Sequence, residues 1–526
     1  MYPASFAVTV PDRTALVVAG SGDAVTYAAL DDRSARLAGL LYAAGLRPGD
    51  TLLIACGNDV RWGEVFWAAR RSGLHLAAVN RHLSAAELVP MTEDARPAAV
   101  VAGGAGIATA LDDALARAGV PVPAVRLVIG PDVPSGWTGH DAAVAAAPRL
   151  PRDAETTGGR ILWSSGTTGR PKPFRVAPTG GHPADGPVRS AALMRSLGFR
   201  TEPTGPGEAP DVLLVAGPAY HAGPLGFLQS VQEVGGTVVL MERFEPEAAL
   251  AAIERYRVTH SQWVPTMFVR LLRLPDEVRN RYDLSSHRVA VHGAAPCPPE
   301  TKRAVLDWWG PIVHEYYGSS EGYGRTTIGP HEWRERPGSV GRPAGSTVHV
   351  ADADGRPLGP GEVGAVWFAR PGAAEPQRRP DGTADLAATP GWGTAGDLGH
   401  VDADGYLYLD GRSGHTIITG GVNVYPREVE DVLLPHPEVA DAAVVGLPAP
   451  EFGERVVAVV VPAADTDRTG LADRLVAHCR ARLAGFKTPR EVRLVESLPR
   501  SDAGKVRMGE LRASLVPEPA GSRPWS

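Results

Sequence analysis

The chain has 526 residues, of which 44% are hydrophobic and 21% are charged, and its formal net charge is -6. This balance is typical of globular proteins and argues against a disordered chain. No block of like charges and no basic stripe stands out, so a nucleic-acid partner is not expected.

The length predicts roughly three to four compact units. The three cysteines, Cys56, Cys297 and Cys479, lie far apart and lack the spacing of metal ligands. They therefore argue against a zinc site or a disulfide scaffold and fit a reducing compartment. Because neither a signal-peptide pattern nor an apolar run of about 20 residues occurs, we expect a cytoplasmic protein without a membrane span.

The N-terminal part alternates predicted helices with short apolar strands. Thr26 is a candidate N-cap for a helix that ends near Gly45. Further elements are expected in the order strand 51–56, helix 62–72, strand 98–102 and strand 212–216. Apolar runs of this length are typical of the buried strands of a mainly parallel sheet, so this part is predicted to be an α/β domain.

From Gly338 the pattern changes to short strands with frequent turns. Asp354-Gly355 and Asp404-Gly405 are typical hairpin signals, and together they predict a small β subdomain. The segment 372–389 is rich in proline, glycine and alanine, and we expect it to be a flexible inserted loop.

Beyond Arg412 the sequence predicts a separate small α+β unit. Its expected elements are a helix at 426–434, strands at 443–445 and 456–461, and a helix at 471–483. We therefore predict a large domain over residues 1–412 and a small, mobile C-terminal domain over 413–526.

Lysine is rare in this chain, which has only Lys172, Lys302, Lys487 and Lys505 among 53 basic residues. Where arginine is the default cation, a lysine indicates a place that needs a compact ammonium group on a flexible stem. The neighbouring residues favour such a role for Lys172 and Lys505. Lys302 is expected to be an ordinary surface lysine.

A glycine- and hydroxyl-rich loop follows the strand-like segment 160–163. It consists of Ser164, Ser165, Gly166, Thr167, Thr168, Gly169, Arg170, Pro171 and Lys172. Its glycines can turn backbone N–H groups toward a ligand, its hydroxyls are further donors, and Lys172 adds positive charge. These properties predict a polyphosphate site, although the loop is not a Walker loop because no Gly-Lys-Ser/Thr follows Gly169.

This loop resembles the phosphate loop of the adenylate-forming superfamily, which includes acyl-CoA synthetases, luciferases and the adenylation domains of nonribosomal peptide synthetases. Three further segments are similar to motifs of that family in the same order. They are the adenine- and magnesium-binding segment 316–322, the ribose-binding stretch and hinge at 396–412, and the catalytic-lysine loop 499–505.

The resemblance implies a nucleotide site for ATP. Beyond the phosphate loop, its expected residues are Gly293, Ala294, Ala295, Tyr316, Tyr317, Gly318, Ser319, Asp397 and Arg412, with Gly420 and Gly421 in a strand that borders a pantetheine tunnel. Asp397 is expected to bind the ribose hydroxyls and Arg412 to bridge ribose and phosphate.

The resemblance also implies the catalytic residues Lys505, Glu321, Ser320 and His221. Glu321 is expected to bind Mg²⁺, which takes one or two protein carboxylates together with phosphate oxygens. Lys505 is expected to stabilise charge as the attacking oxygen displaces pyrophosphate. Ser320 stands where the family usually has threonine and keeps the hydroxyl. His221 is either a gate or pocket residue or an ordinary core residue.

The roles of one histidine and one tryptophan stay open. His292 either reaches the acyl pocket or is a buried structural histidine, and Trp263 borders the pocket, with a packing role as the commoner explanation. Two departures bear on the mechanism. Pro173 replaces the usual glycine after Lys172. Gly414 and His415 stand where the family usually has an Asp or Lys hinge residue followed by an acid.

The function predicted is therefore a carboxylate:CoA ligase that uses ATP and Mg²⁺, forms an acyl-AMP, and then transfers the acyl group to coenzyme A. The alternatives are transfer to an amine or carrier protein, or activation of nitrite with diazotisation of an aromatic amine. A non-catalytic nucleotide-binding scaffold is a third alternative. The expected partner is a small carboxylic acid; the oligomeric state is open, with a homodimer as one option.

Overall fold

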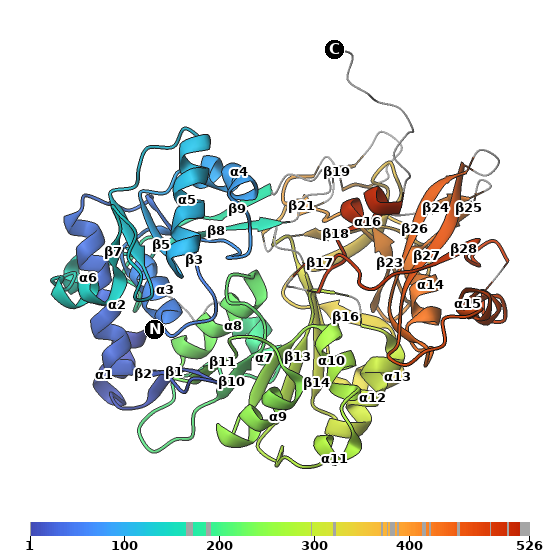
Figure 1. The fold of residues 1–526 in the computed structure, drawn as a ribbon, viewed down its shortest axis with the longest axis horizontal. Coiled ribbons are helices and arrows are strands. Elements are labelled where there is room, and N and C mark those ends of the chain that lie inside the picture. The colour runs from blue at the N-terminus through green and yellow to red at the C-terminus, as the bar shows by residue number, and fades with distance from the viewer. Residues whose placement is uncertain are drawn as a thin grey trace. The chain divides into compact units, whose positions relative to one another are not determined.

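The computed structural model describes residues 2–164, 172–185, 191–295, 297–318, 322–369, 372–375, 377–378, 384–386, 389–412, 417–419, 422–449, 453–483, 485–501 and 504–515. The chain divides into two compact units (Figure 1). The first comprises residues 1–263 and 273–291, and the second comprises 264–272 and 292–526.

One sheet of the first unit has the strand order β7-β6-β5-β3-β4-β8-β9. Its strands are β3 (Thr51–Ala55), β4 (His75–Ala78), β5 (Ala99–Ala102), β6 (Val125–Val128), β7 (Thr138–Gly139), β8 (Gly159–Ser164) and β9 (Lys172–Val176). All neighbours pair in parallel except β8 and β9, which form an antiparallel edge. The predicted mainly parallel α/β sheet is confirmed.

Helices cover both faces of this sheet because its strands are apolar on both sides. They are α2 (Tyr27–Ala43), α3 (Arg61–Arg71), α4 (Ala85–Ala95), α5 (Ala105–Arg117), α6 (His140–Ala146) and the 3-10 helix η1 (Arg152–Ala154). Leu53 and Val100 pack with α4 and α5 in one buried cluster. Successive strand residues point to opposite faces, so the equally buried Leu52 and Ile54 face the other side, where α3 adjoins β4.

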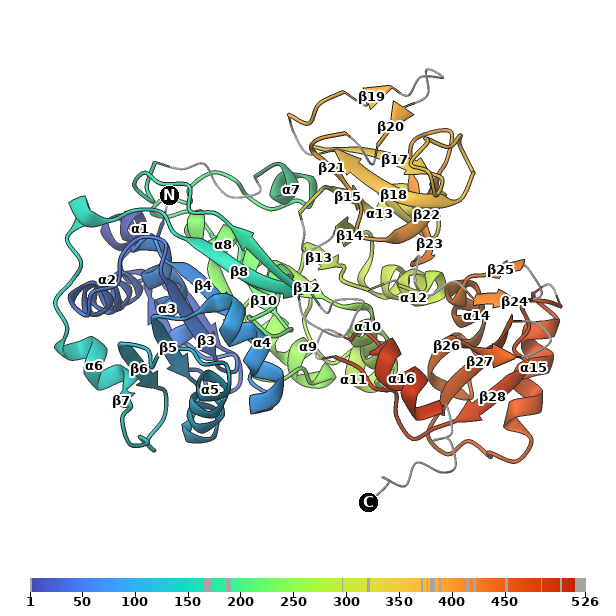
Figure 2. The same ribbon diagram turned by 90° about the horizontal axis from the view of Figure 1, so that it is seen from above.

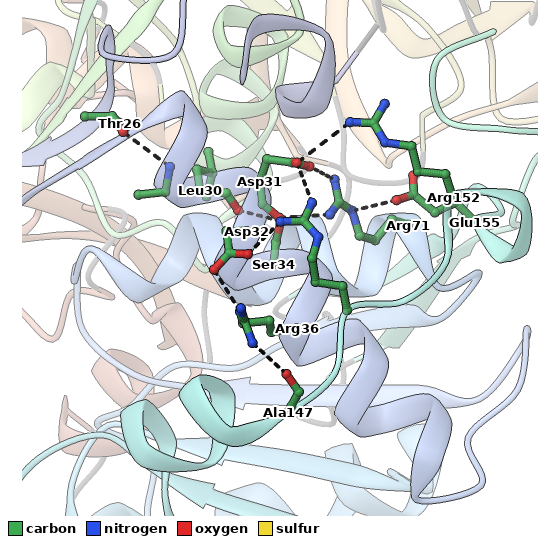
Figure 3. A network of polar contacts seen from close by, with 12 residues as sticks. Thr26, Leu30, Asp31, Asp32, Ser34, Arg36, Arg71, Ala147, Arg152 and Glu155 are labelled. Atoms are coloured by element: carbon green, nitrogen blue, oxygen red, sulfur yellow. Dashed lines mark hydrogen bonds and ion pairs between the residues drawn. The ribbon is translucent and has the colours of Figure 1, made fainter. Parts of the chain in front are cut away.

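The predicted cap of α2 is confirmed, since the Thr26 hydroxyl accepts a hydrogen bond from the Ala29 amide. Asp31 on the same helix lies in a buried charge network (Figure 3). It pairs with Arg71 of α3 at 2.6 Å and with Arg149 at 2.7 Å. Buried charges persist only when they are paired, so this network fixes α2, α3 and the segment before β8 together.

The second sheet of the first unit has the order β12-β10-β11-β1-β2. Its strands are β1 (Thr14–Val18), β2 (Ala24–Thr26), β10 (Val212–Val215), β11 (Thr237–Leu240) and β12 (His260–Trp263). The accompanying helices are α1 (Pro3–Thr9), α7 (Ala191–Ser196), α8 (Ala222–Glu233), α9 (Pro246–Arg255) and α11 (Asp276–Arg279). Only β2 runs antiparallel to its neighbour.

Strand β13 (Val289–His292) carries the chain from the first unit into the second. There, short antiparallel strands follow one another in the order β17-β18-β22-β23-β16-β15-β14. They are β14 (Val313–Gly318), β15 (Arg325–Ile328), β16 (Ser339–Pro343), β17 (Thr347–Ala351), β18 (Gly364–Ala369), β22 (Asp397–Val401) and β23 (Leu407–Arg412), with β21 (Trp392–Gly393) paired to β18. Helices α10 (Pro265–Leu272), α12 (Pro299–Trp309) and α13 (Pro330–Glu335) accompany them.

The predicted β subdomain is thus confirmed, and Asp404-Gly405 forms the turn between β22 and β23. Asp354-Gly355 makes a tight turn too, with the Gly355 amide bonded to the Asp352 carbonyl, but the connection from β17 to β18 is longer than a simple hairpin. The expected loop 372–389 lies partly outside the described residues and contains the short paired strands β19 (Gln377–Arg378) and β20 (Ala384–Asp385).

The C-terminal part of the second unit has three layers (Figure 2). Its sheet comprises β24 (Ile417–Thr419), β25 (Val422–Val424), β26 (Val439–Ala449), β27 (Gly453–Pro462) and β28 (Glu491–Leu494). Helices α14 (Pro426–Leu433) and α15 (Leu471–Arg480) cover one face through one apolar cluster, and α16 (Met508–Leu515) covers the other face through a second cluster. The predicted α+β composition is confirmed. Among the described residues, no helix is long and apolar enough to cross a membrane.

Candidate active site

The predicted phosphate loop is the connection of the β8–β9 hairpin in the first unit. The register pairs Ser164 with Lys172, and Trp163 with Pro173. Residues 165–171, including Ser165, Gly166, Thr167, Thr168 and Gly169, lie outside the described part of the chain. Pro173 lies in β9, the last strand of its sheet, which is where proline is normally tolerated.

Tyr220 and His221 end the connection from β10 to α8, also in the first unit. The Tyr220 side chain is buried, and its ring centroid lies 4.7 Å from that of His221. His221 is the N-cap residue of α8, and its amide donates to the Pro218 carbonyl at 3.2 Å. The structure therefore holds both side chains in a defined turn rather than a loose loop.

In the second unit, Gly293 and Tyr316 lie in direct contact. A side-chain carbon on Gly293 would come within 2.7 Å of the Tyr316 carbonyl oxygen and 2.8 Å of its ring. Burial raises the pKa of the Tyr316 hydroxyl to about 12, so this side chain stays neutral. The next residue, Ala294, has a φ of 68°, which is rare for a residue with a side chain and is typical of functional loops. Ala295 follows it before α12.

Tyr317 and Asp397 are brought together from β14 and β22. The Tyr317 hydroxyl donates a hydrogen bond of 2.6 Å to Asp397 Oδ2, and the Asp397 side chain is only 9% exposed. The antiparallel register of β22 and β23 places Asp397 directly opposite Arg412. Three residues predicted to bind a nucleoside thus meet in one part of the sheet, and Gly318 ends β14 beside them.

The segment before these tyrosines contains a buried ion pair that corrects the prediction for Lys302. Its side chain is fully buried, its ammonium group lies 2.6 Å from Glu315 Oε2, and it packs over the Trp333 ring. The prediction of a surface lysine was therefore wrong. Lys302 can be buried because a carboxylate from another element, Glu315 of β14, next to Tyr316, balances its charge. The rarity of lysine in this chain was the available signal.

His292 is fully buried against the edge of Phe268, with Nε2 at 3.5 Å from Glu315 Oε2. Burial, and then the positive charge of Lys302, hold the pKa of the imidazole well below its usual range. Within the described residues neither ring nitrogen has a hydrogen-bond partner. These observations favour the buried structural alternative for His292. Trp263 is likewise fully buried, with its Nε1 bonded to Ser261, as expected for packing.

Lys505 lies in a tight loop that is closed by backbone pairing. The Ser501 amide donates to the Lys505 carbonyl at 2.8 Å, and Arg500 pairs with Val506 across the loop. Arg500 is held by Asp441 of β26 at 2.6 Å. A side-chain carbon on Gly504 would come within 2.8 Å of the Thr266 hydroxyl, so the loop lies beside the start of α10. The Lys505 side chain is exposed there.

Several predicted residues lie outside the described part of the chain: Ser319, Ser320, Glu321, Gly414, His415, Gly420 and Gly421. The predicted metal ligand Glu321 is among them. In the residues that are described, no group of three or more histidine, cysteine, aspartate or glutamate side chains could hold a metal ion.

The three cysteines are free thiols, and burial raises the pKa of Cys56 well above its usual value.

Comparisons with known proteins agree with these motifs. Residues 4–376 match the model of the AMP-binding enzyme family, and residues 428–505 match the model of its C-terminal domain. A feruloyl-CoA synthase from Amycolatopsis sp is 34% identical over 502 residues, which are 95% of each chain.

Two solved structures are similar over nearly the whole chain. The amide bond synthetase McbA from Marinactinospora thermotolerans has a TM-score of 0.76 at 30% identity, covering 96% of this chain and 97% of that one. The o-succinylbenzoate CoA synthetase MenE from Bacillus subtilis, in complex with its acyl-adenylate intermediate, has a TM-score of 0.76 at 27% identity, covering 99% and 98%. The chain therefore belongs to the AMP-binding, adenylate-forming enzyme family and is an ATP-dependent, AMP-forming ligase of the acyl-CoA synthetase type.

Proposed function

We propose that this enzyme joins a small carboxylic acid to coenzyme A. In the first step a carboxylate oxygen attacks the α-phosphorus of ATP, pyrophosphate leaves, and an acyl-AMP forms. In the second step the thiol of coenzyme A attacks the acyl carbon, AMP leaves, and the thiol proton passes to solvent. The product is an acyl-CoA thioester.

The observation that carries the nucleotide assignment is the hydrogen bond between Tyr317 and Asp397, with Arg412 at the position opposite Asp397 in the β22–β23 register. A buried carboxylate beside a tyrosine hydroxyl is suited to accept hydrogen bonds from the two ribose hydroxyls. Gly293 lets the Tyr316 ring pack directly against the backbone, where any larger residue would clash. In this proposal the loop 164–172 binds the phosphates, and Glu321 holds the Mg²⁺ that accompanies them.

The thioester step is supported by the similarity to CoA ligases and by a hollow in the C-terminal part. The hollow is lined by Arg480, Gly485, Thr488, Pro489 and Arg490. The Thr488 hydroxyl is buried there without a hydrogen-bond partner among the described residues. Arg480 and Arg490 bring positive charge to its lining, which suits a phosphate group such as coenzyme A carries. We also propose that the small domain, residues 413–526, moves between the two steps; the two family matches end and resume on either side of residue 412.

The direct test is to incubate the protein with ATP, Mg²⁺, coenzyme A and a panel of aliphatic and aromatic carboxylic acids. We expect pyrophosphate and AMP to appear in amounts equal to the coenzyme A consumed, with an acyl-CoA detected by mass spectrometry. Pyrophosphate release without loss of free thiol, for every acid that is activated, would contradict the thioester step.

A second candidate is amide formation, because the amide bond synthetase is similar over 96% of this chain. In that reaction an amine replaces coenzyme A as the attacking group. Adding an amine panel to the same assay separates the two candidates, since only the true acceptor speeds AMP release. A nitrite-dependent turnover with an arylamine would instead favour diazotisation.

Replacing Tyr317 with phenylalanine tests the nucleoside site. The variant loses the hydrogen bond to Asp397, and hydrogen bonds to charged groups contribute about 1.5–3 kcal/mol. We therefore expect the KM for ATP to rise by about tenfold or more at saturating acid. Tyr408→Phe is the control. The Tyr408 ring lies in β23 and stacks on His400, so removing its hydroxyl should leave the KM for ATP unchanged. An equal effect of both variants would contradict the assignment.

A further inference from the structure

The turn that carries Tyr220 and His221 is held by a side chain from the other sheet of the first unit. Asn58 lies in the connection between β3 and α3. Its Nδ2 donates to the Gly217 carbonyl at 2.9 Å and to the Met241 carbonyl at 2.8 Å. Its Oδ1 accepts a hydrogen bond from the Ala219 amide at 2.8 Å. One amide group therefore joins three backbone groups that follow β10 and β11.

The connection that presents Asn58 is itself rigid. The indole of Trp62, a fully buried residue, donates to the Gly57 carbonyl at 2.7 Å. On the other side, Asp59 Oδ1 accepts a hydrogen bond of 2.8 Å from the amide of Arg61, the first residue of α3. Because the residues on both sides of Asn58 are fixed, its side chain transmits the position of the first sheet to the turn after β10.

The side-chain chemistry explains why asparagine stands here. The site needs two donors and one acceptor on a short stem, and only the asparagine amide supplies both at this length. Aspartate would keep the acceptor for Ala219 but would place a carboxylate oxygen against two carbonyl oxygens. The buried backbone groups would then lose their partners, which costs free energy for each of them.

We propose that Asn58 is a positioning residue that sets the Gly217–His221 turn and, through Tyr220 and His221, the binding of the acid substrate. The proposal rests on the proposed function for its link to the acid. It does not require Asn58 to touch any substrate. Its distinctive consequence is a change in the binding of the acid without a matching change in the binding of ATP.

The test uses the full-length variants Asn58→Ala and Asn58→Asp, with Tyr27→Phe as the matched control. Tyr27 is fully buried, and its hydroxyl donates to the Gly236 carbonyl at 2.7 Å, just before β11 begins. The Tyr27→Phe variant therefore loses a comparable long-range hydrogen bond at the opposite end of β11. Asn58→Ser, which keeps a small polar group, replaces the alanine variant if that protein accumulates poorly.

Two readouts are needed, and the first requires no substrate. Hydrogen exchange of a peptide covering residues 216–222 should become faster in both Asn58 variants and stay unchanged in Tyr27→Phe. In pyrophosphate exchange, the KM for the acid should rise about tenfold or more in Asn58→Ala while the KM for ATP stays within about twofold, and Asn58→Asp should be more severe.

If hydrogen exchange of that peptide is unchanged in Asn58→Ala, Asn58 does not hold the turn, whatever the activity of the protein. Faster exchange with equal effects on the acid and on ATP would overturn the positioning role. If the wild-type protein activates no acid, the proposed function fails and the link to the acid fails with it, while the exchange result still decides whether Asn58 holds the turn.

Discussion

Replacing Lys505 with alanine should lower the rate of adenylate formation by about 100- to 1000-fold, because one positioned charge at a developing negative centre contributes about 3–4 kcal/mol. The loop between Arg500 and Val506 is closed by its own backbone pairing and anchored to β26 through Asp441. Loss of the ammonium group should therefore remove charge without unfolding the loop. Pyrophosphate exchange measures the effect, and calorimetric titration with ATP should show binding largely intact.

The control for this experiment is Arg507→Ala. Arg507 is an exposed cation two residues away, bonded to Glu510 at 3.0 Å, and its loss changes the net charge by the same amount. We expect near-normal pyrophosphate exchange from it. A second comparison supplies synthetic acyl-AMP and coenzyme A to the Lys505→Ala protein. If thioester formation from acyl-AMP falls as much as adenylation does, Lys505 is not specific to the first step and the assigned role is wrong.

Much of the fold could be predicted because local patterns decide it. The Thr26 cap, the apolar runs that became β3, β5 and β10, and the Asp404-Gly405 turn each depend on residues close in sequence. Helix and strand ends moved by a few residues, since the last turns depend on packing; the helix expected at 471–483 ends at Arg480. The four motifs also identified the family, because each is a short continuous segment.

What could not be predicted depends on partners that are distant in sequence. Asn58 bonds to groups 159 and 183 residues away, and nothing in its neighbourhood indicates them. Lys302 has the same difficulty, because an isolated lysine on a helix is usually solvated. Its partner Glu315 becomes a neighbour only because α12 packs against β14. His292 stayed open from the sequence for the same reason, since its surroundings come from α10 and β14.

Replacing Lys302 with methionine should destabilise the second unit strongly. The substitution leaves the Glu315 carboxylate buried without its cation, and breaking such a pair typically costs about 3–5 kcal/mol. For a unit of this size we expect the Tm of its unfolding transition to fall by on the order of 10 °C. Glu315 immediately precedes Tyr316 and Tyr317 in β14, so the KM for ATP should rise in the same variant.

The matched control is Arg303→Met on the next residue of α12. Arg303 is exposed and pairs with Glu300 at 2.6 Å, and exposed ion pairs of this kind contribute little. We expect no measurable change in Tm from it. The double variant Lys302→Met with Glu315→Met removes both charges and should recover much of the lost Tm, because no buried charge is then left unpaired. A Tm that stays equally low in the double variant would mean that the cost lies in packing against Trp333 rather than in the unpaired carboxylate.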